Sequence, residues 1–346
     1  MKNQIDVNAV LAGDRRALAR FLTAIENETA SGRQTLDAVF KRTGQAHIIG
    51  VTGSPGAGKS SLVNQLVKYF RQADPSKKIA IIAVDPSSPF TGGALLGDRV
   101  RMRDLSGDEG IFIRSMATRG ALGGLARTTS AMAEALDAAG FEMIFIETVG
   151  AGQSEVDIVR LAHTTIVVEA PGMGDDIQAS KAGILEIADI LVVNKADQPM
   201  AENAVRTLKA MLELGHPIVQ SAAERLHHRA LAFEAVEVTS DIHQNSEAES
   251  WQVPVLTTIS TEGVGIQETA EKILEHGVAL KQRGEWKKRE AARLQEALHD
   301  LLIQTFLEKW QRESSSDFVQ AVIRDMLNRV HSPHQALQIL IKGQNK

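Results

Sequence analysis

The chain has 346 residues, 43% of them hydrophobic, which is enough apolar material for one large α/β domain with additions or for two small domains. Its net charge of −5 gives no general electrostatic reason to bind nucleic acid or an anionic membrane, and the absence of cysteine excludes disulfides and cysteine-ligated metal centres. No apolar run reaches the roughly 20 residues that span a bilayer, and the N-terminus lacks a signal-peptide block. We therefore expect a cytoplasmic protein without nucleic-acid or membrane partners.

Residues 1–45 carry apolar residues at helical spacing and predict an N-terminal helical extension. From His47 onward, short apolar runs alternate with amphipathic stretches. Runs that are apolar on consecutive residues are typical of strands buried on both faces, and helices between them indicate right-handed crossovers. The pattern predicts an α/β fold with a doubly wound, mainly parallel sheet over residues 46–275. The runs are 48–51, 79–84, 111–113, 143–146, 165–168, 190–193 and 253–259.

The strongest motif is Gly-Ser-Pro-Gly-Ala-Gly-Lys-Ser at residues 53–60, which fits G-x-x-x-x-G-K-[ST] in full. It follows an apolar run and precedes an amphipathic helix, as a phosphate-binding loop requires, and it predicts a P-loop NTPase. Lys59 can reach the β- and γ-phosphates of a nucleotide, and the Ser60 hydroxyl can bind Mg²⁺. A glycine-rich turn without function is the alternative. The predicted phosphate contacts are Gly53, Gly56, Ala57, Gly58, Lys59, Ser60 and Ser61.

Three acidic residues follow strands at the edge of the sheet where ligands bind. Asp85 directly follows the run 79–84, and Asp98 lies in the glycine-rich loop after it. Glu147 directly follows the run 143–146. Hard oxygen ligands of this kind suit Mg²⁺, so Glu147 is predicted to bind the ion directly or through a water molecule. The backbone N–H of Gly150 is predicted to donate a hydrogen bond to the γ-phosphate. Alone, an acid after a strand is often a cap or turn residue, and for Asp98 this alternative stays open.

A base-specificity motif, Asn194-Lys195-Ala196-Asp197, follows the run 190–193 and fits N-K-x-D. A carboxylate at Asp197 can accept two hydrogen bonds from N1–H and the exocyclic amine of guanine, and adenine lacks this donor pair. Lys195 would lie along the base and Asn194 would hold the loop. The last strand ends near Ser260 and Thr261, where a backbone contact to the guanine oxygen is expected. GTP and GDP are the predicted ligands.

After about residue 276 the chain is helical to its end, and we expect residues 276–346 to form a C-terminal arm. Two apolar helical faces, one around Leu298 and Phe306 and one around Val322 and Ile323, suit self-association; packing on the chain's own sheet is the alternative. The ten histidines are scattered and predict no further metal site. Residues 287–289, Lys-Lys-Arg, are interpreted as a solvated helix face.

The residues from about 48 to 266 resemble the MeaB/ArgK family of G proteins. The resemblance implies a GTP-hydrolysing chaperone that protects a coenzyme-B12-dependent (adenosylcobalamin-dependent) acyl-CoA mutase, such as methylmalonyl-CoA mutase, and gates its cofactor loading. It implies a homodimer formed by the C-terminal arm, with no cobalamin bound directly. The matching blocks are VTGSPGAGKSSL, AVDPSSPFTGGALLGDRVRM, ETVGAGQSEVDI, APGMGDDIQASKAGILEIADILVVNKAD and GVGI.

By the same resemblance, Ser60, Asp85, Asp98 and Glu147 occupy magnesium-site positions, and residues 171–181 occupy a family-specific mobile switch. Lys181 is then expected to act with Lys59 and Glu147 in catalysis or its regulation. The alternative for residues 171–181 is an ordinary strand-to-helix connection. Other functions stay open on this fold, namely a metal-insertion GTPase, a small-molecule kinase, or a nucleotide-dependent scaffold with negligible turnover.

Overall fold

The computed structural model describes residues 5–85, 102–105, 107–117, 124–148, 161–172, 187–213 and 251–342. The chain forms two compact units, Met1–Leu294 and Gln295–Lys346. Helix α11 (Glu285–Glu313) crosses the boundary between them. Across these ranges, no helix is both long enough and apolar enough to cross a membrane.

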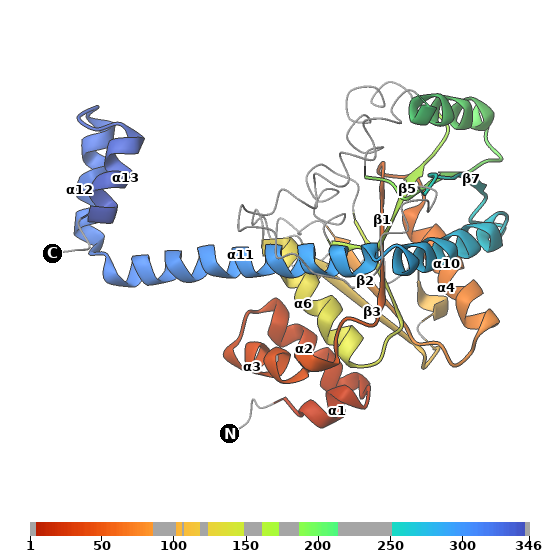
Figure 1. Ribbon diagram of the computed structural model, residues 1–346, viewed down its shortest axis with the longest axis horizontal. Coiled ribbons are helices and arrows are strands. Elements are labelled where there is room, and N and C mark those ends of the chain that lie inside the picture. The colour runs from red at the N-terminus through yellow and green to blue at the C-terminus, as the bar shows by residue number, and fades with distance from the viewer. Residues whose placement is uncertain are drawn as a thin grey trace. The chain divides into compact units, whose positions relative to one another are not determined.

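The first unit is built on a seven-stranded sheet in the order β3-β2-β4-β1-β5-β6-β7, in which every strand pair is parallel (Figure 1). The predicted fold class, a doubly wound parallel α/β sheet of the P-loop type, is confirmed. All seven apolar runs form strands, because a buried backbone must satisfy its hydrogen bonds within the sheet. Five of the strands are buried at nearly every position, whereas residues 111–117 and 255–258, which form the two edge strands, are partly exposed. The strands are β1 (His47–Gly53), β2 (Ile79–Asp85), β3 (Ile111–Ala117), β4 (Met143–Glu147), β5 (Thr164–Glu169), β6 (Ile190–Asn194) and β7 (Val255–Thr258).

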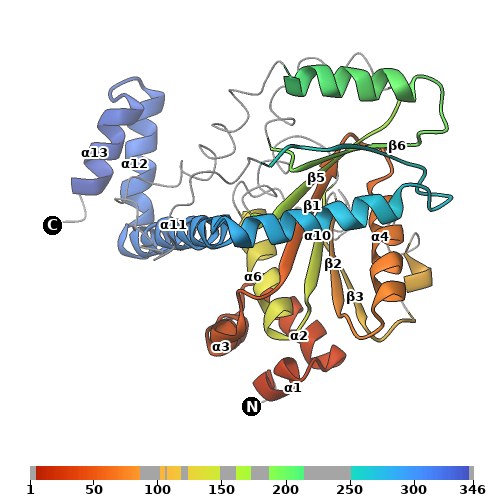
Figure 2. The ribbon, with the colours of Figure 1, turned by 45° about the vertical axis from the view of Figure 1, so that its right-hand side comes forward.

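Helices cover both faces of the sheet, and alternate residues of each strand enter two different cores. Ile48 of β1 packs with α6 (Gly124–Ala138) and the N-terminal helices, whereas its neighbour Ile49 packs with α4 (Lys59–Ala73) and α10 (Ile266–Gln282). Figure 2 shows α4 and α6 on opposite sides of the strands. Residues 201–213 form a further helix, which packs through Leu208 beside β6.

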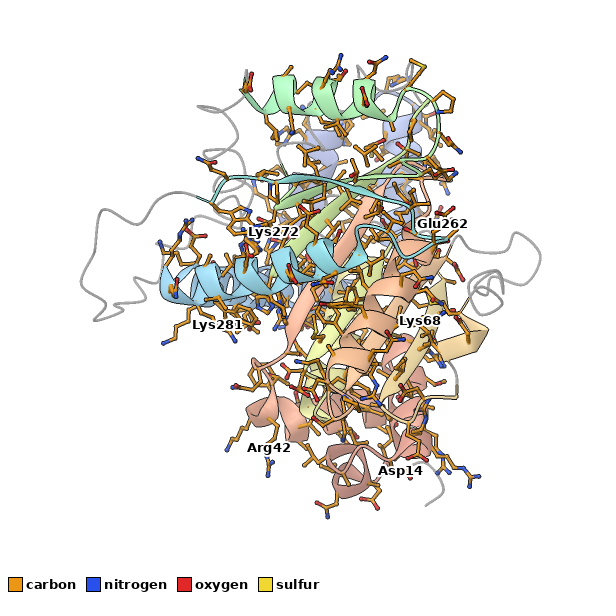
Figure 3. The ribbon with its side chains drawn as sticks, turned by 90° about the vertical axis from the view of Figure 1, so that its right-hand side faces the viewer. Asp14, Arg42, Lys68, Glu262, Lys272 and Lys281 are labelled. Carbon is orange, nitrogen blue, oxygen red and sulfur yellow. The ribbon has the colours of Figure 1, made fainter. Side chains whose placement is uncertain are left out.

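The N-terminal extension consists of three helices, α1 (Val7–Leu11), α2 (Arg15–Glu26) and α3 (Ala30–Val39), followed by a 3₁₀ turn, η1 (Phe40–Arg42). Each α-helix begins at a residue whose side chain accepts backbone N–H groups: Asp6, Asp14 and Thr29. The apolar face of α2 packs against α6. Figure 3 shows Asp14 and Arg42 of this extension at the end of the unit away from Glu262, which follows the last strand.

The beginning of α11 belongs to the first unit and is buried in it. The side chain of Trp286 is 8% exposed. The guanidinium of Arg289 donates two hydrogen bonds of 2.9 Å to the carboxylate of Asp189, which lies just before β6. The interpretation of residues 287–289 as a solvated face is therefore wrong for Arg289, although Lys287 and Lys288 are exposed. The reason is helical spacing: Arg289 lies one turn after Trp286 and shares its buried side.

Three histidines far apart in the sequence gather at the amino ends of β1 and β5. The Thr164 hydroxyl lies 2.7 Å from His47 Nε2 and 2.8 Å from His276 Nδ1, and the ring of His163 stacks on Trp286 at 3.8 Å. Burial lowers the pKa of His163 and of His276 to about 4 and holds that of His47 well below its usual value. Burial alone would raise the pKa of Asp189, but Arg289 and His276 hold it at about 2.

Within the second unit, the last two helices, α12 (Ser316–Leu327) and α13 (Pro333–Lys342), lie side by side. In this second unit Val322 and Ala336 are the buried apolar residues among those described. Many of its other large apolar side chains are at least a third exposed: Leu298, Leu301, Leu302, Ile303, Phe306, Leu307, Ile323, Leu327, Val330, Leu337 and Ile341.

Candidate nucleotide-binding site

The loop between β1 and α4 has the geometry of a phosphate cradle. Its glycines adopt positive φ values, +130° at Gly53, +79° at Gly56 and +92° at Gly58. A Cβ atom on Gly53 would lie 1.9 Å from the carbonyl oxygen of Val168, so no larger residue fits beside β5. The loop ends at the N-terminus of α4, whose first-turn N–H groups and dipole favour an anion.

Lys59, the first residue of α4, is 6% exposed and turns back over this loop. Its ammonium group donates hydrogen bonds to the carbonyl oxygens of Gly53, at 2.8 Å, and Ser54, at 3.1 Å. The charged end of the side chain is therefore held at the mouth of the loop where phosphate oxygens would enter. This placement agrees with a phosphate-directed lysine.

Oxygen ligands suited to Mg²⁺ lie beside the loop. Ser60 Oγ donates to Glu147 Oε1 at 2.5 Å, and both side chains are buried. Ala83 is the residue opposite Glu147 on the neighbouring strand, so Asp85 lies two residues further along β2 at the same edge. A hydroxyl and a carboxylate in contact beside the phosphate loop, with a second carboxylate at the same edge of the sheet, form a donor set that fits Mg²⁺.

Asn194 connects three loops of the site. Its amide nitrogen donates to the carbonyl oxygen of Ala57 in the phosphate loop, at 2.9 Å. Its amide oxygen accepts hydrogen bonds from Thr258 Oγ1, at 3.0 Å, and from the backbone N–H and hydroxyl of Ser260, at 3.2 and 2.8 Å. The loops after β1, β6 and β7 are thereby fixed relative to one another through one buried side chain.

The loop after β6 presents an exposed carboxylate. Lys195 has a φ of +57°, which turns the chain outward, and Asp197 follows as an exposed residue. Beyond β7, Ile259 pairs with Val264 in an antiparallel bridge, so residues 260–263 form a tight turn with Ser260 buried and Thr261 exposed. This arrangement leaves Asp197 and the turn at one edge of the sheet.

Three predicted site residues, Asp98, Gly150 and Lys181, lie outside the described residues, as does most of the expected switch at 171–181. Two contacts were not anticipated from the sequence: that between Ser54 and Glu169, and that between Thr258 and Asn194. Neither the residue types nor their spacing in the sequence predicts these contacts, because each contact depends on which strands become neighbours in the sheet. In the part of the chain that the structure describes, no group of three or more acidic or histidine side chains could hold a metal ion by itself.

The parallel sheet, the glycine loop and the buried lysine define a P-loop nucleotide-binding protein. The profile of one family, described as Methylmalonyl Co-A mutase-associated GTPase MeaB, matches residues 18–315. The chain belongs to this family, and the resemblance seen in the sequence is confirmed.

Several relatives support this assignment. A Pyrococcus horikoshii protein whose name assigns it to the GTPases is 40% identical over 330 residues, 95% of this chain and 94% of the relative. GTPase ArgK of Escherichia coli K12 is 38% identical over 230 residues, 65% of this chain and 68% of that protein. The fused isobutyryl-CoA mutase of Cupriavidus metallidurans is 37% identical over 227 residues, 65% of this chain but 20% of that longer protein.

A solved structure has a similar fold along nearly the whole chain. It is described as an LAO/AO transport system kinase, is 26% identical, and superposes with a TM-score of 0.61 over 98% of this chain and 96% of that one.

Proposed function

We propose that this chain is a Mg²⁺-dependent enzyme that hydrolyses GTP to GDP and phosphate. The observation that carries the proposal is the 2.5 Å contact between Ser60 and Glu147 at the start of α4, because it brings a hydroxyl and a carboxylate together beside the phosphate loop. Ser60, Asp85 and Glu147 would hold Mg²⁺, with Asp98 as a further ligand. When bound, the ion supplies charge neutralisation to the β- and γ-phosphate oxygens.

In the proposed reaction, the oxygen of a water molecule forms a bond to the γ-phosphorus while the bond to the β–γ bridging oxygen breaks. Negative charge develops on that bridging oxygen and on the γ-phosphoryl oxygens. We expect Lys59 and the N–H groups of Gly56 and Gly58 to stabilise it, because the loop is already curled. The N–H of Ala57 donates to the carbonyl oxygen of Ser54 at 3.1 Å and helps to hold this curl. Asp197 selects guanine at the other end of the nucleotide.

A Mg²⁺ titration of hydrolysis tests this assignment. Glu147→Gln should raise the Mg²⁺ concentration for half-maximal phosphate release by at least about tenfold, because a charged ligand is lost. Glu109→Gln, an equivalent change on the exposed turn before β3, is the control. Unaltered Mg²⁺ dependence in Glu147→Gln would remove this residue from the metal site.

The GTP cycle is proposed to act on an adenosylcobalamin-dependent acyl-CoA mutase, which the chain would protect and whose cofactor loading it would gate. Support comes from the family description and from the relative in which a similar stretch forms part of a fused isobutyryl-CoA mutase. A fusion keeps two parts at high effective concentration, as expected for partners that work together. The cobalamin would stay with the mutase and not bind this chain directly.

Phosphate release measured with and without a purified acyl-CoA mutase tests the partnership. We expect the mutase to accelerate hydrolysis, Lys59→Ala to lose it by about 10²-fold or more, and Lys181→Ala to keep the basal rate but lose the acceleration. The last variant addresses the proposed switch at 171–181. A mutase that neither accelerates hydrolysis nor co-elutes with the chain in any nucleotide state would contradict the partnership but not the hydrolysis.

A homodimer formed by the second unit is also proposed. Leu298, Leu302 and Phe306 follow one another at four-residue spacing on α11 and are 58%, 36% and 68% exposed, so they share one face of the helix. An exposed apolar face of this kind is uncommon on a monomer surface. A second copy of the chain would cover it symmetrically.

A second candidate reaction is phosphoryl transfer to a small molecule, because the solved structure of similar fold is described as a kinase. Hydrolysis in ¹⁸O-labelled water distinguishes the two. Label in the released phosphate identifies water as the acceptor, whereas a phosphorylated metabolite without labelled phosphate would identify a kinase.

A further inference from the structure

The side chain of Thr148 ties the end of β4 to the end of β1. Its Oγ1 donates a hydrogen bond to Thr52 Oγ1 at 3.1 Å, and its backbone N–H donates to the carbonyl oxygen of Val51, also at 3.1 Å. Thr148 is 2% exposed, and Thr52 is fully buried. Two hydrogen bonds therefore hold the first residue after β4 on the neighbouring strand.

Both threonines are next to the proposed site in the sequence. Thr52 comes directly before the phosphate loop, and Thr148 comes directly after Glu147, the carboxylate in contact with Ser60. Val51 lies opposite Glu147 in the pairing of β1 with β4, so the bonds of Thr148 continue this pairing by one residue. The strand end that presents Glu147 is thus the point that the hydroxyl bond fixes.

The two hydroxyl groups lie on the other face of the sheet from Glu147. Val51 packs in the core that contains α4, whereas Ile146 packs in the core that contains α6, and these helices cover opposite faces (Figure 2). Because alternate residues of a strand face opposite sides, Glu147 lies on the α4 side, and Thr52 and Thr148 lie on the α6 side. The hydroxyl bond can therefore act on the proposed metal site only through the backbone.

Two hydrogen bonds restrict the end of β4 more than one would. If only the N–H bond were present, the residue could turn about it and carry the neighbouring carboxylate along. The hydroxyl bond acts at a second point and removes this freedom. Such restriction matters for Mg²⁺, because this ion requires near-ideal octahedral geometry from its ligands.

We propose that Thr148 is a positioning residue of the metal site: its hydroxyl, held on Thr52, fixes the strand end that presents Glu147 to Mg²⁺. The inference rests on the proposed Mg²⁺-dependent hydrolysis and deepens it. Loss of this hydroxyl weakens Mg²⁺ binding although no ligand of the ion is removed. Nucleotide binding in the absence of the metal stays as it was, because the phosphate loop is not altered.

The main test measures the affinity of the GDP complex for Mg²⁺ by calorimetric titration, together with the Mg²⁺ dependence of phosphate release. Thr148→Val keeps the shape of the side chain and removes its donor. We expect Mg²⁺ affinity to fall about fivefold, the change that the net contribution of one buried hydrogen bond, about 1 kcal/mol, produces. Thr148→Ser keeps the hydroxyl and should bind Mg²⁺ as the unmodified chain does. GDP affinity measured in EDTA should be the same in all three proteins.

Thr164→Val is the matched control. Thr164 is also a fully buried threonine, but it lies at the amino end of β5, away from the phosphate loop, and its hydroxyl contacts two histidines. This variant should lose stability in urea unfolding while its Mg²⁺ affinity stays unchanged. Equal losses of Mg²⁺ affinity in Thr164→Val and Thr148→Val would reduce the role of Thr148 to general stability and overturn the inference.

A variant that combines Thr52→Val with Thr148→Val separates positioning from stability. Each single variant leaves one buried hydroxyl without its partner, whereas the double variant removes both. Its free energy of unfolding should therefore exceed that of either single variant. Its Mg²⁺ affinity should stay low, because the hydroxyl bond is still absent.

Three outcomes would contradict the inference and leave the proposed hydrolysis intact: unchanged Mg²⁺ affinity in Thr148→Val, a serine variant that behaves like the valine variant, or normal Mg²⁺ affinity in the double variant. A change of GDP affinity in EDTA that matches the change in Mg²⁺ affinity would place the effect on the phosphate loop and contradict it as well. Failure of the proposed function would instead appear in the unmodified chain, as absent phosphate release or as release that does not require Mg²⁺, and it would overturn both.

Discussion

The amide nitrogen of Asn194 donates to the carbonyl oxygen of Ala57 at 2.9 Å, joining the loop after β6 to the phosphate loop 137 residues earlier in the chain. A Cβ atom on Gly58 would lie 2.3 Å from the same nitrogen, so the two loops are in close contact. The parts of the site that would hold base and phosphate therefore form one connected structure. Disturbing this amide should affect folding and nucleotide binding together.

Asn194→Ala should lower the free energy of unfolding by about 2–4 kcal/mol, because it removes four buried hydrogen bonds and leaves partners unsatisfied. Nucleotide affinity should fall at least about tenfold, since the two loops lose their fixed separation. Urea unfolding and titration with GDP measure the two effects. Thr258→Val, which removes one of the four bonds, is the control and should cost about 1 kcal/mol. An Asn194→Ala variant that is destabilised but binds GDP with unchanged affinity would show that this amide has no part in nucleotide binding.

Asp197→Asn should shift nucleotide preference from guanine to xanthine. The exposed carboxylate of Asp197 can accept hydrogen bonds from two N–H groups of guanine. The amide of the variant can instead donate a hydrogen bond to the C2 oxygen of xanthine. Competition between GDP and XDP measures the shift, with Glu202→Gln on the following helix as a control. Equal affinity of the unmodified chain for ADP and GDP would show that this loop does not select the base.

The sequence was informative wherever structure depends on local pattern. The seven strands were predictable because buried parallel strands read as continuous apolar runs, and the loop at Gly53 because its glycines are required by backbone geometry. Contacts that depend on strand order were not predictable. Ser54 and Glu169 are 115 residues apart, and the histidines around Thr164 meet because β1 pairs with β5 and α10 packs on β5. Arg289 was misjudged because its partner, Asp189, lies 100 residues away.

Acidification should destabilise the first unit between about pH 6.5 and pH 4. Burial lowers the pKa of His163 and His276 to about 4, so the unfolded chain binds protons first as the pH falls. The stabilisation that these uncharged histidines provide is complete above pH 6.5 and is lost as the pH approaches 4. Each histidine contributes up to about 3 kcal/mol to the free energy of unfolding. Glu134 and Asp137, whose pKa values burial raises, act in the opposite direction.

A comparison between variants isolates the histidine contribution. Urea unfolding at pH 7.5 and pH 5 should show a smaller pH dependence in His276→Gln than in the unmodified chain, because one group with a shifted pKa is gone. His334→Gln, on the exposed surface of α13, should leave the dependence unchanged. The same slope in all three proteins would mean that the buried histidines do not govern acid stability.

Self-association should depend on the second unit and not on the beginning of α11. Leu298→Glu combined with Phe306→Glu places charges on exposed apolar positions and should convert a dimer into a monomer that still binds GTP, as light scattering would show. Gln304→Glu, on the same helix, is the control.

Truncation tests the same point: a chain ending at Leu294 keeps Trp286 and Arg289 in place and should be a folded monomer. Ending the chain at residue 284 should cost stability as well, because Asp189 loses its guanidinium partner while buried. A dimer that survives both the double substitution and truncation after Leu294 would place the interface on the first unit.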